Sequence, residues 1–104
     1  MSNYLLDPCV EDELRDIWDY IAQDNPQAAT AVIEAVFDTF RILAETSHIG
    51  TTRKFRNPRL RGIRSIPVTG FPNYLVFYRV PAGVLQVHHV YQGARDLSAL
   101  FNEF

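Results

Sequence analysis

The chain has little of what several classes of protein require. Its 104 residues include one cysteine, so no disulfide can form within the chain, and such sparse use is typical of a reducing compartment. No apolar run is long enough to span a bilayer, and Met1 to Tyr4 show no signal-peptide pattern. We therefore expect one cytoplasmic domain over residues 1–104, with no membrane contact.

Cofactor and metal motifs are also missing. The sequence has no phosphate-cradling glycine loop, no nucleophile elbow and no cysteine pair. His88 and His89 are adjacent, so on a strand they face opposite sides and cannot jointly bind one metal ion. We predict no cofactor and no metal, and we expect Cys9 to be a small core residue.

The charge is divided between the two halves of the chain. Residues 1–45 carry ten acids against two arginines, a net of −8, and residues 46–104 carry eight cations against two acids, a net of +6. The small total of −2 hides this asymmetry. The division predicts a two-sided molecule with a basic surface for an anionic partner, either nucleic acid or an acidic protein segment.

Two proline-led segments predict a helical hairpin. Asp7-Pro8 and Asn25-Pro26 each place a capping side chain before a proline at the first helical position. The first helix should end near Gln23, and its apolar stripe comprises Val10, Leu14, Ile17, Trp18 and Ile21. The second should run from about Pro26 to Ala44 with a wider apolar face.

The rest of the chain predicts a sheet. Asn73 to Val80 is apolar on both alternating faces, which indicates a central strand covered on both sides. Further strands are expected at Tyr4 to Leu6, Ile63 to Val68 and Val84 to Tyr91, with a loop from Thr46 to Pro58. This order, βααβββ, predicts an α+β domain with the helical hairpin on one face of a mostly antiparallel sheet. The other face is expected to be open to a partner.

Basic residues gather just before the predicted central strand. Six cations fall in twelve positions, namely Arg53, Lys54, Arg56, Arg59, Arg61 and Arg64. The guanidinium fork suits phosphate and carboxylate, so the stretch indicates an anion-binding surface, with a solvated loop that balances the acidic helices as an equal alternative. Arg79 either pairs with an N-terminal acid or faces a bound anion, and Arg95 either does the same or pairs with Asp96.

Four segments together resemble the ParE toxins of the ParE/RelE superfamily. They are Ile17 to Ala22 with Asp24-Asn25-Pro26, Leu60 to Val68, Tyr74 to Val80, and Tyr91 to Leu97. They occur in the family's order and cover nearly the whole chain. The resemblance implies the toxin of a type II toxin–antitoxin module, a plasmid stabilisation system, neutralised by a ParD-like antitoxin bound on the helices and the open sheet face. ParE-type members are associated with inhibition of DNA gyrase.

The RelE branch of the superfamily instead cuts mRNA on the ribosome, which needs cations and an acid–base group. Residues 96–104 contain no tyrosine, histidine or lysine, which favours a gyrase-directed binder over a nuclease. In the nuclease alternative the candidate catalysts are Lys54, Arg61, Arg79, His88, His89, Tyr91 and Arg95. A non-toxic binding module is a third alternative.

The predicted contact surface for target and partner combines the basic residues with apolar ones near the C-terminus. Its members are Arg53, Lys54, Arg56, Arg59, Arg61, Arg64, Arg79, Arg95, Leu97, Leu100 and Phe101.

Overall fold

The computed structural model describes residues 4–54 and 58–93, except for the side chain of Leu60. Two helices and five strands follow one another as β1 (Tyr4–Leu6), α1 (Pro8–Ala22), α2 (Pro26–Glu45), β2 (Thr51–Thr52), β3 (Arg64–Val68), β4 (Phe71–Arg79) and β5 (Leu85–Gln92). Short 3₁₀ turns occupy Ser47–Ile49, Pro58–Leu60 and Pro81–Gly83.

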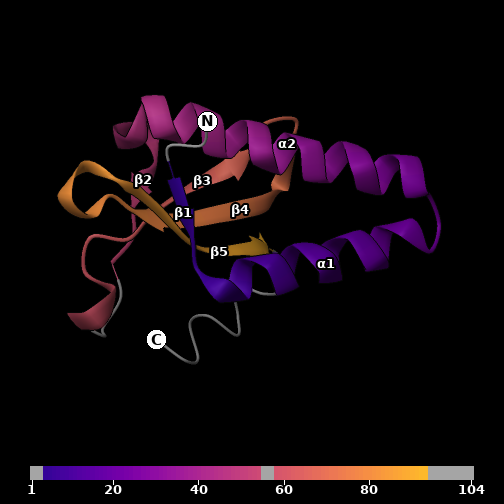
Figure 1. Cartoon of the computed structure of the whole chain (residues 1–104), viewed down its shortest axis with the longest axis horizontal. Coiled ribbons are helices and arrows are strands. Elements are labelled where there is room, and N and C mark those ends of the chain that lie inside the picture. Colours follow the sequence, from indigo (N-terminus) through magenta and orange to yellow (C-terminus); the bar gives the residue numbers. More distant parts are fainter. Residues whose placement is uncertain (1–3, 55–57, 94–104) are drawn as a thin grey trace.

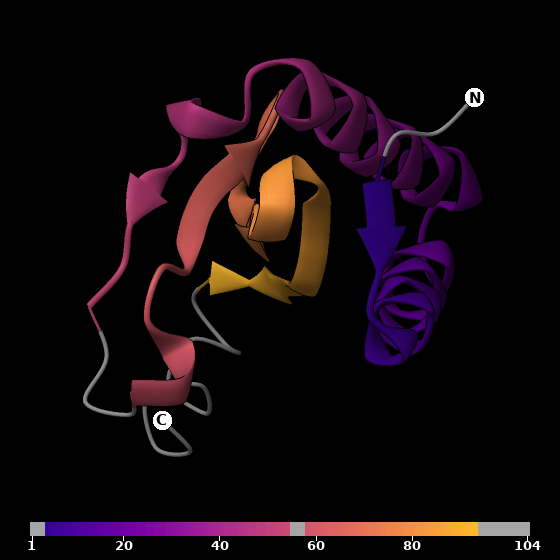
Figure 2. The same ribbon diagram turned by 60° about the vertical axis from the view of Figure 1, so that its left-hand side comes forward.

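The molecule has two layers, a sheet and a helical hairpin laid across one of its faces (Figures 1 and 2). The strand order is β1-β5-β4-β3-β2, with β1 parallel to β5 and the other neighbours antiparallel. This arrangement confirms the predicted α+β fold. The βααβββ order lacked one short strand, because β2 lies inside the segment that was expected to be a loop.

The two helix starts differ in how they are capped. The Asn25 side chain accepts a hydrogen bond from the backbone N–H of Ala28 at 3.1 Å, as the sequence predicts. Asp7 precedes α1 but makes no side-chain cap, so that prediction was wrong. Its carboxylate instead accepts hydrogen bonds from Gln86 and His88 on β5. The Asp7 side chain therefore contacts β5 instead of capping α1, which is the role that the local sequence predicts for it.

Strand β4 lies in the middle of the sheet, as predicted. Val76 and Tyr78 belong to the core formed with the helices, and both are 0% exposed. Phe77 points to the opposite face and is only 1% exposed. Side chains on both faces of one strand are thus removed from water, which agrees with its doubly apolar sequence.

The far face of the sheet is less open than the sequence predicts. Ser65 and Ile63, on the same side of the molecule as Phe77, are 3% and 4% exposed. The backbone N–H of Arg53 donates to the carbonyl of Ile63 at 2.8 Å, and the Arg53 guanidinium lies 5.8 Å from the centre of the Phe77 ring. The expectation of an open face is therefore wrong around Phe77, because the Arg53 side chain of the chain returning from α2 lies over this ring.

The Tyr78 hydroxyl ties this returning chain to β4. It donates to the carbonyl of Ser47 at 2.7 Å and accepts from the backbone N–H of Gly50 at 2.9 Å. A Cβ atom on Gly50 would lie 2.2 Å from that oxygen, so glycine is required by the close approach. Burial also raises the pKa of Tyr78 above its ordinary value of 10.0, although the Gly50 hydrogen bond and Arg64 oppose this shift.

We expect Tyr78→Phe to lower the free energy of unfolding by about 1 to 3 kcal/mol, because two backbone groups lose their partner in a buried place. Tyr20→Phe is the matched control, since Tyr20 is 57% exposed, and its cost should stay below about 0.5 kcal/mol. Urea denaturation followed by far-UV circular dichroism measures both. Equal stability of the two variants would contradict the role assigned to the Tyr78 hydroxyl.

Candidate functional site

The predicted basic stretch divides into structural and exposed residues. Arg53 Nε donates to Ser65 Oγ at 2.6 Å, in addition to its position over Phe77. Arg64 Nη1 donates to the carbonyls of Gly50 at 2.9 Å and His48 at 3.4 Å. These two guanidinium groups hold the chain returning from α2 against the sheet. They are accordingly poor candidates for the binding of an external anion.

Lys54, Arg59 and Arg61 are exposed, and we call these three residues the basic edge. They lie on the segment between β2 and β3, beyond the hydrogen bonds that fix its two ends. The described parts of this segment, up to Lys54 and from Pro58 onward, can be followed in Figure 2. Three exposed cations can meet an anionic surface without a large desolvation cost.

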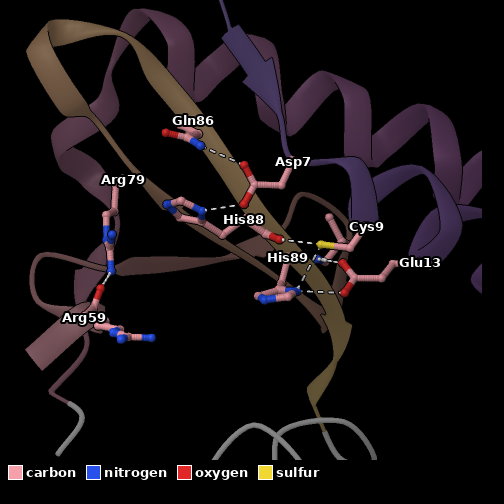
Figure 3. A network of polar contacts seen from close by, with 9 residues as sticks. Asp7, Cys9, Glu13, Arg59, Arg79, Gln86, His88 and His89 are labelled. Carbon is pink, nitrogen blue, oxygen red and sulfur yellow. Dashed lines mark hydrogen bonds and ion pairs between the residues drawn. The ribbon is translucent and has the colours of Figure 1, made fainter. Parts of the chain in front are cut away.

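Arg79 joins the basic edge to the centre of the sheet. Its guanidinium donates to the backbone carbonyl of Arg59 (Figure 3). Its Nε is buried and has no hydrogen-bond partner within residues 4–54 and 58–93. Over the same residues no ion pair joins Arg79 to an acid, so the N-terminal pairing considered from the sequence is not found there.

The other predicted contact residues lie outside the described residues. They are Arg56, Arg95, Leu97, Leu100 and Phe101. Their assignment to the contact surface stays a prediction.

Two histidines of β5 form polar contacts with the beginning of α1 (Figure 3). His88 Nδ1 lies 2.8 Å from Asp7 Oδ2, and Gln86 Nε2 donates to Asp7 Oδ1 at 2.7 Å. His88 Nε2 is buried and has no hydrogen-bond partner among the residues that the structure describes. The carboxylate of Asp7 is thus shared by two side chains of β5, and one ring nitrogen of His88 is committed to it.

His89 lies in a second cluster with Glu13 and Cys9. Its Nδ1 is 2.8 Å from Glu13 Oε2 and 3.7 Å from Cys9 Sγ, while Glu13 Oε1 accepts from the backbone N–H of Val90 at 2.9 Å. The imidazole stacks on the Tyr91 ring with 4.7 Å between centroids. Cys9 Sγ also donates to the carbonyl of His88 at 3.2 Å. Cys9 borders the hydrophobic core as expected, but it also has polar partners that the sequence did not predict.

Electrostatics differ between the two clusters. Burial raises the pKa of the Asp7 carboxyl, but the hydrogen bonds from Gln86 and His88 and the electrostatic attraction of the two nearby imidazoles together outweigh it, so the pKa falls below its ordinary value of 3.8. Burial, with the carboxylates of Glu13 and Asp7, raises the pKa of the Cys9 thiol above its ordinary 9.0. The protein therefore favours a carboxylate at Asp7 and a neutral thiol at Cys9.

Sequence reasoning missed Asp7, Glu13 and the partners of Cys9. The parallel pairing of Leu6 with Val87 brings Asp7 beside His88, and a bulge in β5 pairs Phe77 with His89 but Tyr78 with Val87. Partners separated by 76 to 81 positions leave no local spacing to detect. The usable signal was the short first strand, whose pairing with β5 implies these neighbours.

A hollow of about 390 Å³ lies between α1 and α2. Its lining is mainly apolar, from Leu14, Trp18, Ile33 and Phe37, with Glu11 and Arg15 at the rim. We call these six residues the hairpin groove. Trp18 is 39% exposed there, although its position in the helical stripe predicts burial. An apolar groove of this size is suited to anchor side chains of a partner.

The fold and these surfaces define a small α+β domain with an apolar hairpin groove and an exposed basic edge, both suited to macromolecular contacts. Residues 4–97 match the family model described as ParE toxin of type II toxin-antitoxin system, parDE. The chain belongs to this family, as its sequence motifs predict. Its fold and its family membership are those of a type II toxin component.

A solved structure of the chromosomal ParDE toxin–antitoxin system from P. aeruginosa shares the fold. Its matching chain superposes with a TM-score of 0.66 and 17% sequence identity, over 88% of this chain and 98% of that one. No curated protein sequence matches the chain significantly. Neither described helix is long and apolar enough to cross a membrane.

We expect Asp7→Asn to lower the free energy of unfolding at pH 7 by about 1 to 3 kcal/mol, because the His88 and Gln86 contacts are weakened. Because the pKa of Asp7 is lower in the folded than in the unfolded protein, its ionised carboxylate stabilises the fold at pH values above the unfolded pKa of about 3.9. This stabilisation is lost as the pH falls through the lower pKa of the folded state. The difference from the native chain should therefore narrow below about pH 4. Urea denaturation at pH 7 and pH 3 measures it.

Asp16→Asn is the control, since Asp16 is an exposed acid of α1, the helix that Asp7 precedes. Its effect on stability should be within about 0.5 kcal/mol at both pH values. If Asp7→Asn lowered the free energy of unfolding as much at pH 3 as at pH 7, the ionised Asp7 carboxylate would not be the source of the stabilisation.

Proposed function

We propose that this chain is a cytoplasmic toxin that inhibits DNA gyrase by binding it, and that a ParD-like antitoxin neutralises it. The match to the ParE toxin model over residues 4–97 is the observation that carries the proposal. The antitoxin occupies the hairpin groove and continues onto the uncovered part of the sheet. The basic edge contacts the gyrase complex.

The hairpin groove supports the antitoxin assignment. Its apolar lining on a hairpin rich in acids suits an amphipathic helix that has apolar anchors and basic flanking residues. Trp18 is the only tryptophan in the chain and lies in this groove. Large aromatic side chains in partly buried grooves commonly supply much of the binding energy of an interface.

The contacts that His88 and His89 make with carboxylates of the same chain favour a binding protein over a nuclease. A general base must reach the RNA 2′-hydroxyl with a ring nitrogen. His88 and His89 are 15% and 24% exposed in their side chains, and each directs Nδ1 at a carboxylate. The ring of Tyr91 packs against Phe77 and His89. The candidate acid–base groups of the nuclease alternative are thus occupied by contacts inside the protein.

The target is tested by inducing the chain without antitoxin and pulse-labelling DNA, RNA and protein synthesis. We expect DNA synthesis to fall first, and purified protein to inhibit supercoiling by gyrase in vitro. An immediate fall in protein synthesis with defined mRNA cleavage would overturn the proposal in favour of the ribosome-dependent endonuclease. Unchanged synthesis of all three polymers would identify a non-toxic binding module.

Charge reversal tests the basic edge. We expect Lys54→Glu with Arg61→Glu to raise the protein concentration needed for gyrase inhibition by about tenfold or more, because two attractive contacts become repulsive. Arg41→Glu is the control, an exposed cation on α2 that is not part of the basic edge, and should leave inhibition unchanged. Equal inhibition by both variants would remove the basic edge from the proposal.

Truncation of Trp18 tests the hairpin groove. We expect Trp18→Ala to weaken antitoxin binding by about 30-fold, which corresponds to roughly 2 kcal/mol. Tyr20→Ala is the control, because Tyr20 is an exposed aromatic of α1 that does not line the groove. Isothermal titration calorimetry gives both affinities, and the native Trp18 fluorescence should shift to shorter wavelength on binding. Unchanged affinity of Trp18→Ala would place the antitoxin elsewhere.

A further inference from the structure

We propose that Cys9, Glu13 and His89 form a binding site for a divalent metal ion of the zinc type. One ligand atom from each residue lies within 4.8 Å of the other two. Cys9 and Glu13 are one turn apart on α1, and His89 comes from β5 (Figure 3). Three potential ligands from two elements thus converge on one point.

The separation of the sulfur and nitrogen ligand atoms fits a tetrahedral site, and the third ligand lies within 4.8 Å of both. Zinc bonds of about 2.3 Å to sulfur and 2.0 to 2.1 Å to nitrogen place these two ligand atoms about 3.6 Å apart. Cys9 Sγ and His89 Nδ1 are 3.7 Å apart. His89 Nδ1 and Glu13 Oε2 are 2.8 Å apart, a hydrogen-bond distance, and must separate to about 3.3 Å around an ion. The carboxylate and the ring must therefore move apart by about 0.5 Å when an ion binds.

The chemistry of the three groups selects the class of metal. Thiolate and imidazole are the ligands that zinc prefers, whereas magnesium and calcium require oxygen ligands. Three protein ligands also leave a fourth position for water, as in open zinc sites. On binding, the Cys9 thiol releases its proton to solvent, and His89 takes the tautomer that carries its proton on Nε2.

Contacts outside the ligating atoms already orient two of the ligands. Glu13 Oε1 accepts the Val90 N–H at 2.9 Å, which leaves Oε2 turned toward His89. The His89 ring is stacked on Tyr91 with 14° between the ring planes. Such supporting contacts are characteristic of protein metal sites, because they fix the direction of each ligand. The site is also reachable, since the Glu13 and His89 side chains retain 18% and 24% of their exposure.

The prediction that the chain has no metal site rested on the orientation of His88 and His89 and on the lack of a cysteine pair. The proposed site does not use that pair, because His88 faces Asp7 and only His89 reaches Glu13. The ligands come from positions 9, 13 and 89, so an ion bound there would link the first turns of α1 to β5. This linkage does not depend on the gyrase proposal.

Cobalt and zinc titrations of the full-length protein, freed of any histidine tag, test the site. With Co²⁺ we expect a thiolate-to-cobalt charge-transfer band that saturates at one ion per chain. With Zn²⁺ in competition with a chromogenic chelator, we expect a dissociation constant in the micromolar range or below. Bound Zn²⁺ should also raise the Tm by on the order of 5 °C.

Conservative variants assign the ligands. Cys9→Ser, Glu13→Gln and His89→Gln should each weaken Zn²⁺ binding by about tenfold or more, and Cys9→Ser should abolish the charge-transfer band. His48→Gln is the matched control, because His48 is exposed and lies outside the cluster. Far-UV circular dichroism checks that each variant is folded.

The absence of a thiolate band in the Co²⁺ spectrum of the native chain would overturn the proposal, even if a variant failed to fold. Zn²⁺ affinity that is unchanged by Cys9→Ser would overturn it as well. Neither result would bear on gyrase inhibition, which is measured separately.

Discussion

Burial of β4 on both of its faces is the constraint on which the rest of the structure depends. Val76 and Tyr78 enter the core beneath the helices, so the hairpin must cover that face, while Phe77 requires cover on the other. The Tyr78 hydroxyl cannot remain unpaired in the core, and it finds Ser47 and Gly50 on the chain returning from α2. This bond brings the returning chain to the sheet edge, where β2 forms and the basic edge begins.

The parallel pairing of β1 with β5 has a comparable effect at the other edge. It places the start of α1 beside the β5 bulge, so that Asp7 meets His88 and Glu13 meets His89. These contacts use groups that would otherwise cap a helix or face solvent. They also explain how a cysteine, a carboxylate and an imidazole come together in a chain with no metal-binding spacing. Proximity here follows from strand pairing and not from sequence distance.

The surfaces available to partners are formed by the side chains that these two sets of contacts leave exposed. Arg53 and Arg64 are bound to backbone and side-chain groups of the fold, so among the described residues of that segment the exposed cations are Lys54, Arg59 and Arg61. On the hairpin, the core accepts Leu14 but leaves Trp18 partly exposed in a groove. An apolar groove on the acidic half and a basic edge on the other half give the toxin two chemically distinct faces.

The sequence by itself determined the helical hairpin, the central strand and the α+β class, because helical periodicity, caps such as Asn25 and two-sided apolar strands are local signals. It also located the basic stretch between Arg53 and Arg64 and the family. Only the tertiary structure decided the parallel first strand, the partial cover over Phe77, and the partners of Asp7, Cys9 and Glu13. Those features join residues as many as 81 positions apart, and their energies depend on burial and on competing hydrogen bonds that no local pattern encodes.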